Sequence, residues 1–324
     1  MQHSSDSERR DADLVAAPAL LTDDRRGHVA HYARGALQAA DAIGRIPTPL
    51  DEVSAALHLA TPQELFDLGD APPELARKLR RLFGKVKGAF AVRERVIYLD
   101  REQAAEPRRF VYGHEIGHGA LPWHEDAYYC DDHRTLDPNT DVELEAEASA
   151  FSADLLFNLD TFTKQAHASK IGLAPALELA GIYATSRHSA IRRYVEDSPR
   201  PCALLVLGRF PVQHDGLPSL RVLHSIESRS FRHRYGPIEA CFPKTLPLPG
   251  WQMARDALTA LQGRLAAPIL TGDVTTGSTS RGNVTLDYEI YSNTYQCFVL
   301  VSPHRRLTSG TPVRAAWSTR DSGA

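Results

Sequence analysis

The sequence has few cysteines, and none of them lie close together. Its 324 residues include only four: Cys130, Cys202, Cys241 and Cys297. No two of them form a CxxC pair, and a secreted disulfide scaffold would be denser in cysteine. These spacings predict four reduced thiols, as is typical of a cytoplasmic protein.

Long apolar runs and a strong excess of one charge are also missing. No uninterrupted apolar stretch approaches the ~20 residues of a membrane helix. The first residues, MQHSSDSERRDADLV, are polar and contain no apolar signal core, so we expect neither a secretion signal nor contact with a membrane. The formal net charge of -3 does not indicate binding to DNA or anionic lipid, although a local basic face remains open.

The pattern of apolar residues predicts an α+β protein of several parts. Residues 1–26 are polar and expected to be disordered, and residues 313–324 form a flexible tail. Between them we expect a mainly helical domain at 27–158, a helical segment at 159–198 and an α/β domain at 199–312. In the first domain, helices are predicted at 27–46, 49–59, 71–85, from about Pro107, and at 141–157, with a β-hairpin at 88–99.

In the later parts of the chain, the predicted secondary structure changes from helices to mainly strands near Pro199. Three helices are predicted before it, at 160–169, 174–183 and 186–197. Four strands and one helix are predicted after it, the strands at 202–208, 220–226, 284–292 and 295–302 and the helix at 251–263.

The stretch VYGHEIGHGALPWH contains two histidines four residues apart. Positions i and i+4 share one face of a helix, so His114 and His118 can bind one metal ion through two imidazoles. Glu115 lies one step around the helix, where it can act as a general base toward a water molecule. An extended peptide could add to the edge of the preceding hairpin. The HExxH motif also arises by chance in unrelated sequences, so it does not identify a metal site by itself. A third ligand is needed downstream.

The glutamate-rich helix at 141–157 offers three candidates for this ligand. Glu143, Glu147 and Asp154 fall on one stripe that is predicted to face solvent. Glu145 shares a stripe with Ala148, Ser152 and Leu156, and these mostly small residues permit close approach of another helix. We therefore prefer Glu145 as the third ligand.

The loop after the motif holds further polar side chains. His124, His133, Tyr128 and Tyr129 are candidates for stabilising the oxyanion of a tetrahedral intermediate. Ordinary loop residues are the favoured interpretation of all four. Cys130 is a single thiol and receives little weight as a redox group or a thiol that blocks the metal.

Two motifs resemble those of the ImmA/IrrE metallo-endopeptidases. That family has an apolar hairpin, a helix with HE(I/L)(G/S)H, and a second helix of the form E-x-E-A-N-x-F-A-x-x-L-L-M-P. Here they read RRFVYGHEIGHGAL and EAEASAFSADLLF, the second running from Glu145 to Phe157. The resemblance covers about residues 28–200, and it assigns the metal-ligand role to Glu145. Ser149 stands where the family often has Asn, and Phe157-Asn158 replaces Met-Pro; neither position is expected to touch a ligand.

Longer members that resemble IrrE carry a helix-turn-helix-like segment and a GAF-like domain after the peptidase. The segment ALELAGIYATSRHSAIRRYVED looks like a helix-turn-helix, with Gly181 near the turn and Ser189, Arg192 and Arg193 on its second helix. A helical bundle that packs against the peptidase explains this segment equally well. The match of residues 199–312 to a GAF-like domain rests on element types alone.

The resemblance implies a zinc metallopeptidase of the HExxH…E (gluzincin-like) type, with manganese as an alternative metal. Its substrate would be a helix-turn-helix transcriptional repressor, cut once to release stress-response or mobile-element genes. A small molecule or signal would bind the C-terminal domain. The alternative is a transcriptional regulator that binds DNA or a ligand and has a non-catalytic metal site. A structural zinc site normally has four protein ligands, often cysteines, so the three ligands and adjacent base favour the enzyme.

Overall fold

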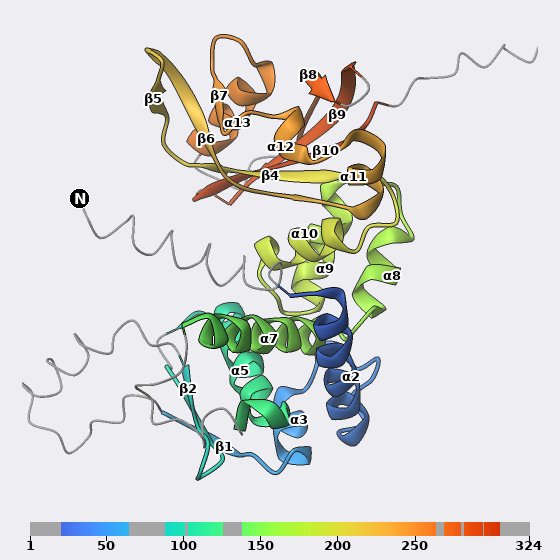
Figure 1. The fold of residues 1–324 in the computed structure, drawn as a ribbon, viewed down its shortest axis with the longest axis vertical. Coiled ribbons are helices and arrows are strands. Elements are labelled where there is room, and N and C mark those ends of the chain that lie inside the picture. The colour runs from blue at the N-terminus through green and yellow to red at the C-terminus, as the bar shows by residue number, and fades with distance from the viewer. Residues whose placement is uncertain are drawn as a thin grey trace, which may run out of the picture.

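The computed structural model describes residues 21–64, 88–100, 103–125, 138–263, 269–279, 282–293 and 295–304. These residues form an α+β protein with three tiers (Figure 1). The lower tier contains α2, α3, α5, α7 and a small sheet; α8, α9 and α10 form the middle tier; a large sheet with its helices forms the upper one. The helix predicted at 71–85 lies outside the described residues.

Four helices build most of the lower tier: α2 (Asp23–Ala39), α3 (Leu50–Ala56), α5 (Ala105–Ala120) and α7 (Pro138–Leu156). They share one core, which includes Leu37, Val53, Ile116 and Phe151. The prediction that disorder extends to Arg26 is wrong for residues 23–26, which form the start of α2. The hydroxyl of Thr22 accepts a hydrogen bond from the Arg25 amide and caps α2, and Asp23 and Asp24 favour the positive end of the helix dipole.

A three-stranded sheet lies beside these helices. The predicted hairpin is confirmed, because β2 (Gly88–Ala91) and β3 (Val96–Leu99) pair antiparallel. Strand β1 (Ala60–Glu64), which pairs parallel to β3, was not predicted. Its sequence ATPQE has no apolar alternation, and its proline is tolerated because the strand lies at an edge. Among the described strands, β2 forms the other edge of this sheet.

Close approach of α5 and α7 depends on small side chains from both helices. A Cβ atom on Gly117 would lie 3.1 Å from Ala148 Cα and 3.3 Å from Phe151 Cβ. One on Gly113 would lie 2.6 Å from Ser152 Oγ. The stripe of Ala148 and Ser152 therefore does face another helix, and that helix carries the HExxH motif.

The middle tier consists of α8 (Thr161–His167), α9 (Leu173–Ile182) and α10 (Arg187–Glu196), as predicted. These helices do not have a core of their own. Phe162, Tyr183 and Tyr194 belong to the same buried cluster as Leu204 and Phe298 of the large sheet. Because this core is shared, removal of the chain after Asp197 would expose the apolar faces of α9 and α10 to water.

The upper tier is an antiparallel sheet with the strand order β5-β6-β4-β10-β9-β8, and β7 pairs with β6. Its strands are β4 (Ala203–Gly208), β5 (Val212–His214), β6 (Leu217–Glu227), β7 (Thr245–Pro247), β8 (Leu270–Thr279), β9 (Gly282–Ser292) and β10 (Gln296–Pro303). Its helices are α11 (Arg229–Tyr235), α12 (Ile238–Cys241) and α13 (Gln252–Gln262). The predicted β4, β6, β9, β10 and α13 are confirmed; β5, β7, β8, α11 and α12 were not predicted.

Both faces of this sheet are covered, which explains the apolar run CALLVLG. Leu205 and Leu207 pack in a cluster with residues of α11, α12 and α13. Leu204 and Val206 point to the opposite face and pack against the middle tier. A strand that is buried on both faces is apolar at every position, not only at alternate ones. Within the described part of the chain, no helix is long and apolar enough to cross a membrane.

A pair of histidines joins α10 to the sheet. His188 of α10 and His224 of β6 stack with an interplanar angle of 6°, and their Nε2 atoms are 3.2 Å apart. Burial lowers the pKa of His188 to about 3 and that of His224 to about 4. Both rings are therefore neutral in the folded protein at pH 7.

The packing of α5 on α7 predicts different effects of alanine at two helical glycines. We expect Gly117→Ala to destabilise the protein by about 1–3 kcal/mol, because the methyl group meets the α7 backbone. Gly181→Ala is the control: no atom of another described segment lies within 4 Å of the place its methyl group would take, so it should be neutral or stabilising by up to about 1 kcal/mol. Chemical denaturation measures both, and equal stabilities would contradict this account of the interface.

The histidine pair predicts acid destabilisation. An unfolded histidine gains a proton near pH 6.5, whereas folded His188 and His224 stay neutral down to about pH 4, so the free energy of unfolding falls as the pH drops through this window. The slope is at most about 1.4 kcal/mol per pH unit for each group. We expect His224→Phe to lose less stability between pH 6.5 and 4.5 than the wild type. His214→Phe, at an exposed position on β5, should keep the wild-type slope.

Candidate metal centre

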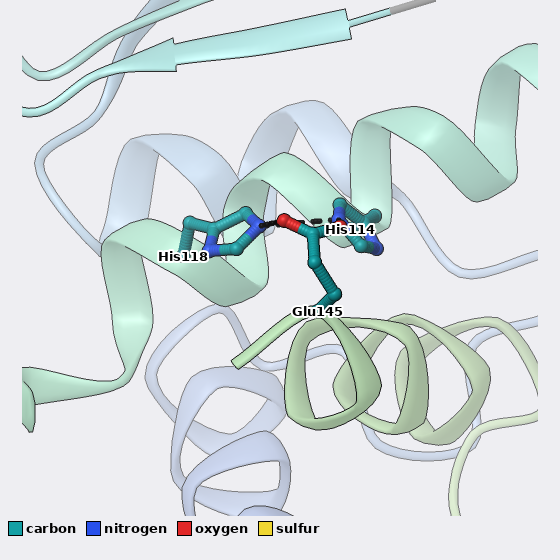
Figure 2. A group of neighbouring side chains, drawn as sticks. All are labelled: His114, His118 and Glu145. Atoms are coloured by element: carbon teal, nitrogen blue, oxygen red, sulfur yellow. Dashed lines mark hydrogen bonds and ion pairs between the residues drawn. The ribbon is translucent and has the colours of Figure 1, made fainter. Parts of the chain in front are cut away.

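The three predicted ligands meet between α5 and α7. Figure 2 shows His114 and His118 on α5, with the Glu145 carboxylate of α7 reaching between them. Glu145 lies 3.1 Å from His114 Nε2 and 3.4 Å from His118 Nε2, and all three ligand atoms lie within 4.8 Å of one another. Two imidazoles and one carboxylate suit a divalent transition metal such as zinc. In the described part of the chain, no other group of three such side chains is close enough to hold one.

The electrostatics of the three ligands reflect their unequal exposure. His114 and His118 are buried, whereas the Glu145 side chain is 46% exposed. Burial lowers the pKa of His118 to about 4, which leaves its ring neutral at pH 7. Burial is the largest effect on the other two and opposes a charge on each, but hydrogen bonds and neighbouring charges together outweigh it: the pKa of His114 is raised and that of Glu145 is lowered.

Glu115 lies beside the centre on the same helix. Its side chain is 7% exposed, and burial raises its pKa to about 7. The start of β2 lies against it, because a Cβ atom on Gly88 would be 2.8 Å from Glu115 Oε1 and would also collide with Val111. The carboxyl group that the motif nominates as base thus lies at the edge strand of the small sheet.

Ser149 contacts one of the ligands, contrary to expectation. Its Oγ lies 3.2 Å from His114 Nδ1. When His114 binds a metal through Nε2, its neutral ring carries the proton on Nδ1 and can donate it to this hydroxyl group. Ser149, at the position where the family often has Asn, is therefore placed to orient His114, a candidate ligand.

The prediction of a solvent-facing stripe on α7 is wrong for two of its three residues. Only Glu143 is exposed, at 53% of its side chain. Glu147 is 2% exposed and Asp154 is 6% exposed. Asp154 pairs with Arg193 of α10 at 3.0 Å, and Glu147 is held by side chains from two other segments.

His124 does not lie where it could stabilise a transition state. It is fully buried behind His118, with its Nδ1 atom 3.0 Å from His118 Nδ1 and its Nε2 atom 3.0 Å from Glu147 Oε2. Burial of the whole side chain agrees with the favoured interpretation, in which His124 is not an oxyanion stabiliser. The sequence contained no local signal for this contact, because six and 23 residues separate His124 from its two partners. Tyr128, Tyr129, Cys130 and His133 lie outside the described residues.

Two arginines of α10, Arg192 and Arg193, are buried, whereas Arg187 at the start of the helix is exposed. Arg193 is 9% exposed, pairs with Asp154 and Asp197, and donates to the Leu159 carbonyl oxygen. Arg192 is 7% exposed and pairs with Glu196. Ser189 bonds through its amide and hydroxyl groups to Ser186, the N-cap of α10. In this conformation neither arginine is available to a DNA backbone.

A cavity of about 620 Å³ separates α5 and α7 from α10 and the sheet. Phe110, Val111 and Ser149 line it on the side of the metal centre. Arg192 and Tyr295 line it on the side of α10 and the β9–β10 connection. The buried Thr185 hydroxyl group also lines the cavity and has no hydrogen-bond partner among the described residues. Ser149 connects this cavity to the metal centre through its bond to His114.

Comparison with known proteins agrees with the two motifs. A search of curated proteins finds no match. Among solved structures, a Mycobacterium tuberculosis transcriptional regulator is 12% identical with a TM-score of 0.49, over 89% of this chain and 80% of that chain. At that level the similarity carries no conclusion about activity. A scan against models of protein families matches residues 77–193, which include His114, Glu115, His118 and Glu145. Residues 77–193 thus carry the domain described as "IrrE N-terminal-like domain" of the family Peptidase_M78, which confirms the resemblance.

Proposed function

We propose that the protein is a metal-dependent endopeptidase. One observation carries this proposal: His114, His118 and Glu145 place their ligand atoms within 4.8 Å of one another, with Glu115 buried next to them on the same helix. Three ligands and a neighbouring carboxylate are the parts of a hydrolytic zinc site, whereas a structural zinc site normally has four ligands. The family match supports a metallopeptidase in coarser terms.

His114, His118 and Glu145 would hold zinc, and the same donors would also accept manganese. When bound, the metal polarises the scissile carbonyl group and makes a water molecule more acidic. Glu115 removes a proton from that water and later returns it to the leaving amine. Its buried position keeps the carboxylate beside the reacting atoms and excludes bulk water from one side.

The substrate would bind as an extended strand on β2. This strand is an edge of the small sheet among the described strands, so its outer backbone groups are available for pairing. Gly88 at its start lies against Glu115, so a peptide paired with β2 would pass close to the base. Backbone pairing of this kind requires an extended segment, and this favours a limited cut in a linker or loop.

We assign the target by resemblance: a helix-turn-helix transcriptional repressor, cleaved once to release stress-response or mobile-element genes. Cleavage would take place in the cytoplasm, where buried free thiols such as Cys202, Cys241 and Cys297 stay reduced. The upper tier would act as a GAF-like sensory domain. The alternative, a DNA-binding regulator, finds little support in α10, since Arg192 and Arg193 are buried in ion pairs. A salt-sensitive, sequence-selective shift of DNA by the purified protein would revive it.

Substitution of the base should separate metal binding from cleavage. Glu115→Gln keeps the size of the side chain and all three ligands, so we expect unchanged zinc content and a loss of cleavage of about 10²-fold or more. Because the substrate is unidentified, new protein N-termini would be compared in cells that express either form. We expect a discrete new terminus in a helix-turn-helix repressor with the wild type only.

Glu143→Gln is the matched control, because Glu143 lies on α7 with its side chain 53% exposed. It should produce the wild-type termini. Termini that persist in Glu115→Gln cells would contradict the assignment of the base. A purified wild-type protein that holds no stoichiometric metal would contradict the proposal as a whole.

A small signal molecule would bind the cavity between the tiers, since both the metal-bearing helices and α10 line it. Ala153 lines this cavity, so Ala153→Leu would fill part of it without removing a polar group. We expect this variant to cleave equally in stressed and unstressed cells, whereas the wild type responds to DNA damage or oxidant. A preserved response in Ala153→Leu cells would remove the cavity from the signalling scheme.

A further inference from the structure

A buried chain of polar side chains extends from His118 away from the other ligands. His118 Nδ1 lies 3.0 Å from His124 Nδ1, and His124 Nε2 lies 3.0 Å from Glu147 Oε2. His124 is fully buried, and Glu147 is 2% exposed. We propose that His124 and Glu147 are positioning residues that fix the tautomer and ring orientation of His118, so that its Nε2 lone pair faces the metal. This inference rests on the proposed metal site.

The positions of the protons in this series of hydrogen bonds follow from its two ends, His118 and Glu147. His118 must offer the Nε2 lone pair to a metal, so its neutral ring carries the proton on Nδ1 and donates it to His124 Nδ1. In its neutral form, His124 then carries its own proton on Nε2 and donates it to Glu147. A carboxylate only accepts, so the chain ends there with every donor matched to an acceptor.

When both rings are neutral, the opposite tautomer of His118 creates an unfavourable contact between His124 and Glu147. If His118 carried its proton on Nε2, His124 would have to donate from Nδ1 to His118. Its Nε2 lone pair would then face the Glu147 carboxylate, and two acceptors would meet at 3.0 Å in a buried site. Glu147 thus selects the metal-binding tautomer of His118 without touching that ring.

Two further contacts hold Glu147 in place. Trp123 Nε1 donates to Oε2 at 2.6 Å, and Arg25 of α2 donates to Oε1 at 2.9 Å. These bonds occupy both carboxylate oxygens and neutralise part of the buried charge. A carboxylate held by three side chains from two other segments has little freedom to turn away from His124.

The neighbouring Glu143 provides a matched comparison. It lies one helical turn before Glu147 and pairs with the same Arg25 side chain at 3.0 Å. However, its side chain is 53% exposed. Substitutions at Glu143 and Glu147 therefore change the same charge on the same helix, but the bond to His124 is made by Glu147.

The test measures metal affinity in the full chain, not peptidase activity. Zinc dissociation constants would be obtained by competition with a chromophoric chelator, and the visible spectrum of the cobalt-loaded protein would report ligand geometry. The amide in Glu147→Gln keeps the shape but can donate or accept, so it no longer selects a tautomer. We expect zinc binding to weaken about 10–100-fold and the cobalt bands to change. Glu143→Gln should match the wild type.

Substitutions at His124 separate tautomer control from packing. In His124→Asn the amide oxygen takes the place of Nδ1 and can still accept the His118 proton, whereas His124→Leu offers no acceptor. We expect His124→Asn to bind zinc more tightly than His124→Leu, with unfolding curves confirming that both variants are folded.

Two results would overturn the inference, and they are distinguishable. If the wild type binds zinc tightly and both Glu147→Gln and His124→Leu bind it equally well, the positioning role is wrong while the metal site stands. If the wild type binds neither zinc nor cobalt, and Glu145→Gln changes nothing, the proposed metal site is wrong, and the positioning role with it.

Discussion

The close contact between α5 and α7 is the constraint on which the centre depends. His114, Glu115 and His118 belong to one helix and Glu145 to the other, so the ligands meet only if the two backbones come close together. Gly113 and Gly117 provide the space, because any side chain there would run into Ser152 or the α7 backbone. Gly113 and Gly117, which directly precede His114 and His118, thus serve packing, while the two histidines are candidate metal ligands.

The acidic residues of α7 point to different sides of the helix and make different contacts. Glu145 points toward α5 and meets both histidines. Glu147, two residues later, points to another side of the helix, where its carboxylate is hydrogen-bonded to Arg25, Trp123 and His124. Asp154 lies further along the same side of α7, near α10, where Arg193 forms an ion pair with its carboxylate. Both buried carboxylates, Glu147 and Asp154, are thus paired, as the cost of burying an isolated charge requires.

The middle tier connects the metal centre to the upper sheet through packing and charge. Its aromatic residues Phe162, Tyr183 and Tyr194 complete a core with the sheet, and Arg193 reaches back to Asp154 on α7. In the segment that resembles a helix-turn-helix, Arg192 and Arg193 are buried in ion pairs with Glu196, Asp154 and Asp197. The similarity in sequence reflects two short helices joined by a turn, a unit that serves packing as readily as DNA recognition.

Local patterns determined the hairpin, the helices with strong apolar periodicity, and the choice of Glu145, because helical spacing alone groups side chains onto faces. They could not reveal β1, whose residues ATPQE form a strand only because β3 pairs with them. Nor could they show that the stripe of Glu147 and Asp154 is buried. A row of carboxylates at helical spacing is normally solvated, and it is buried here because arginines from α2 and α10 arrive from distant parts of the chain. The contacts of Ser149 and His124 with the candidate ligands were also decided by tertiary packing, since a hydrogen bond between side chains of different segments leaves no periodic signal.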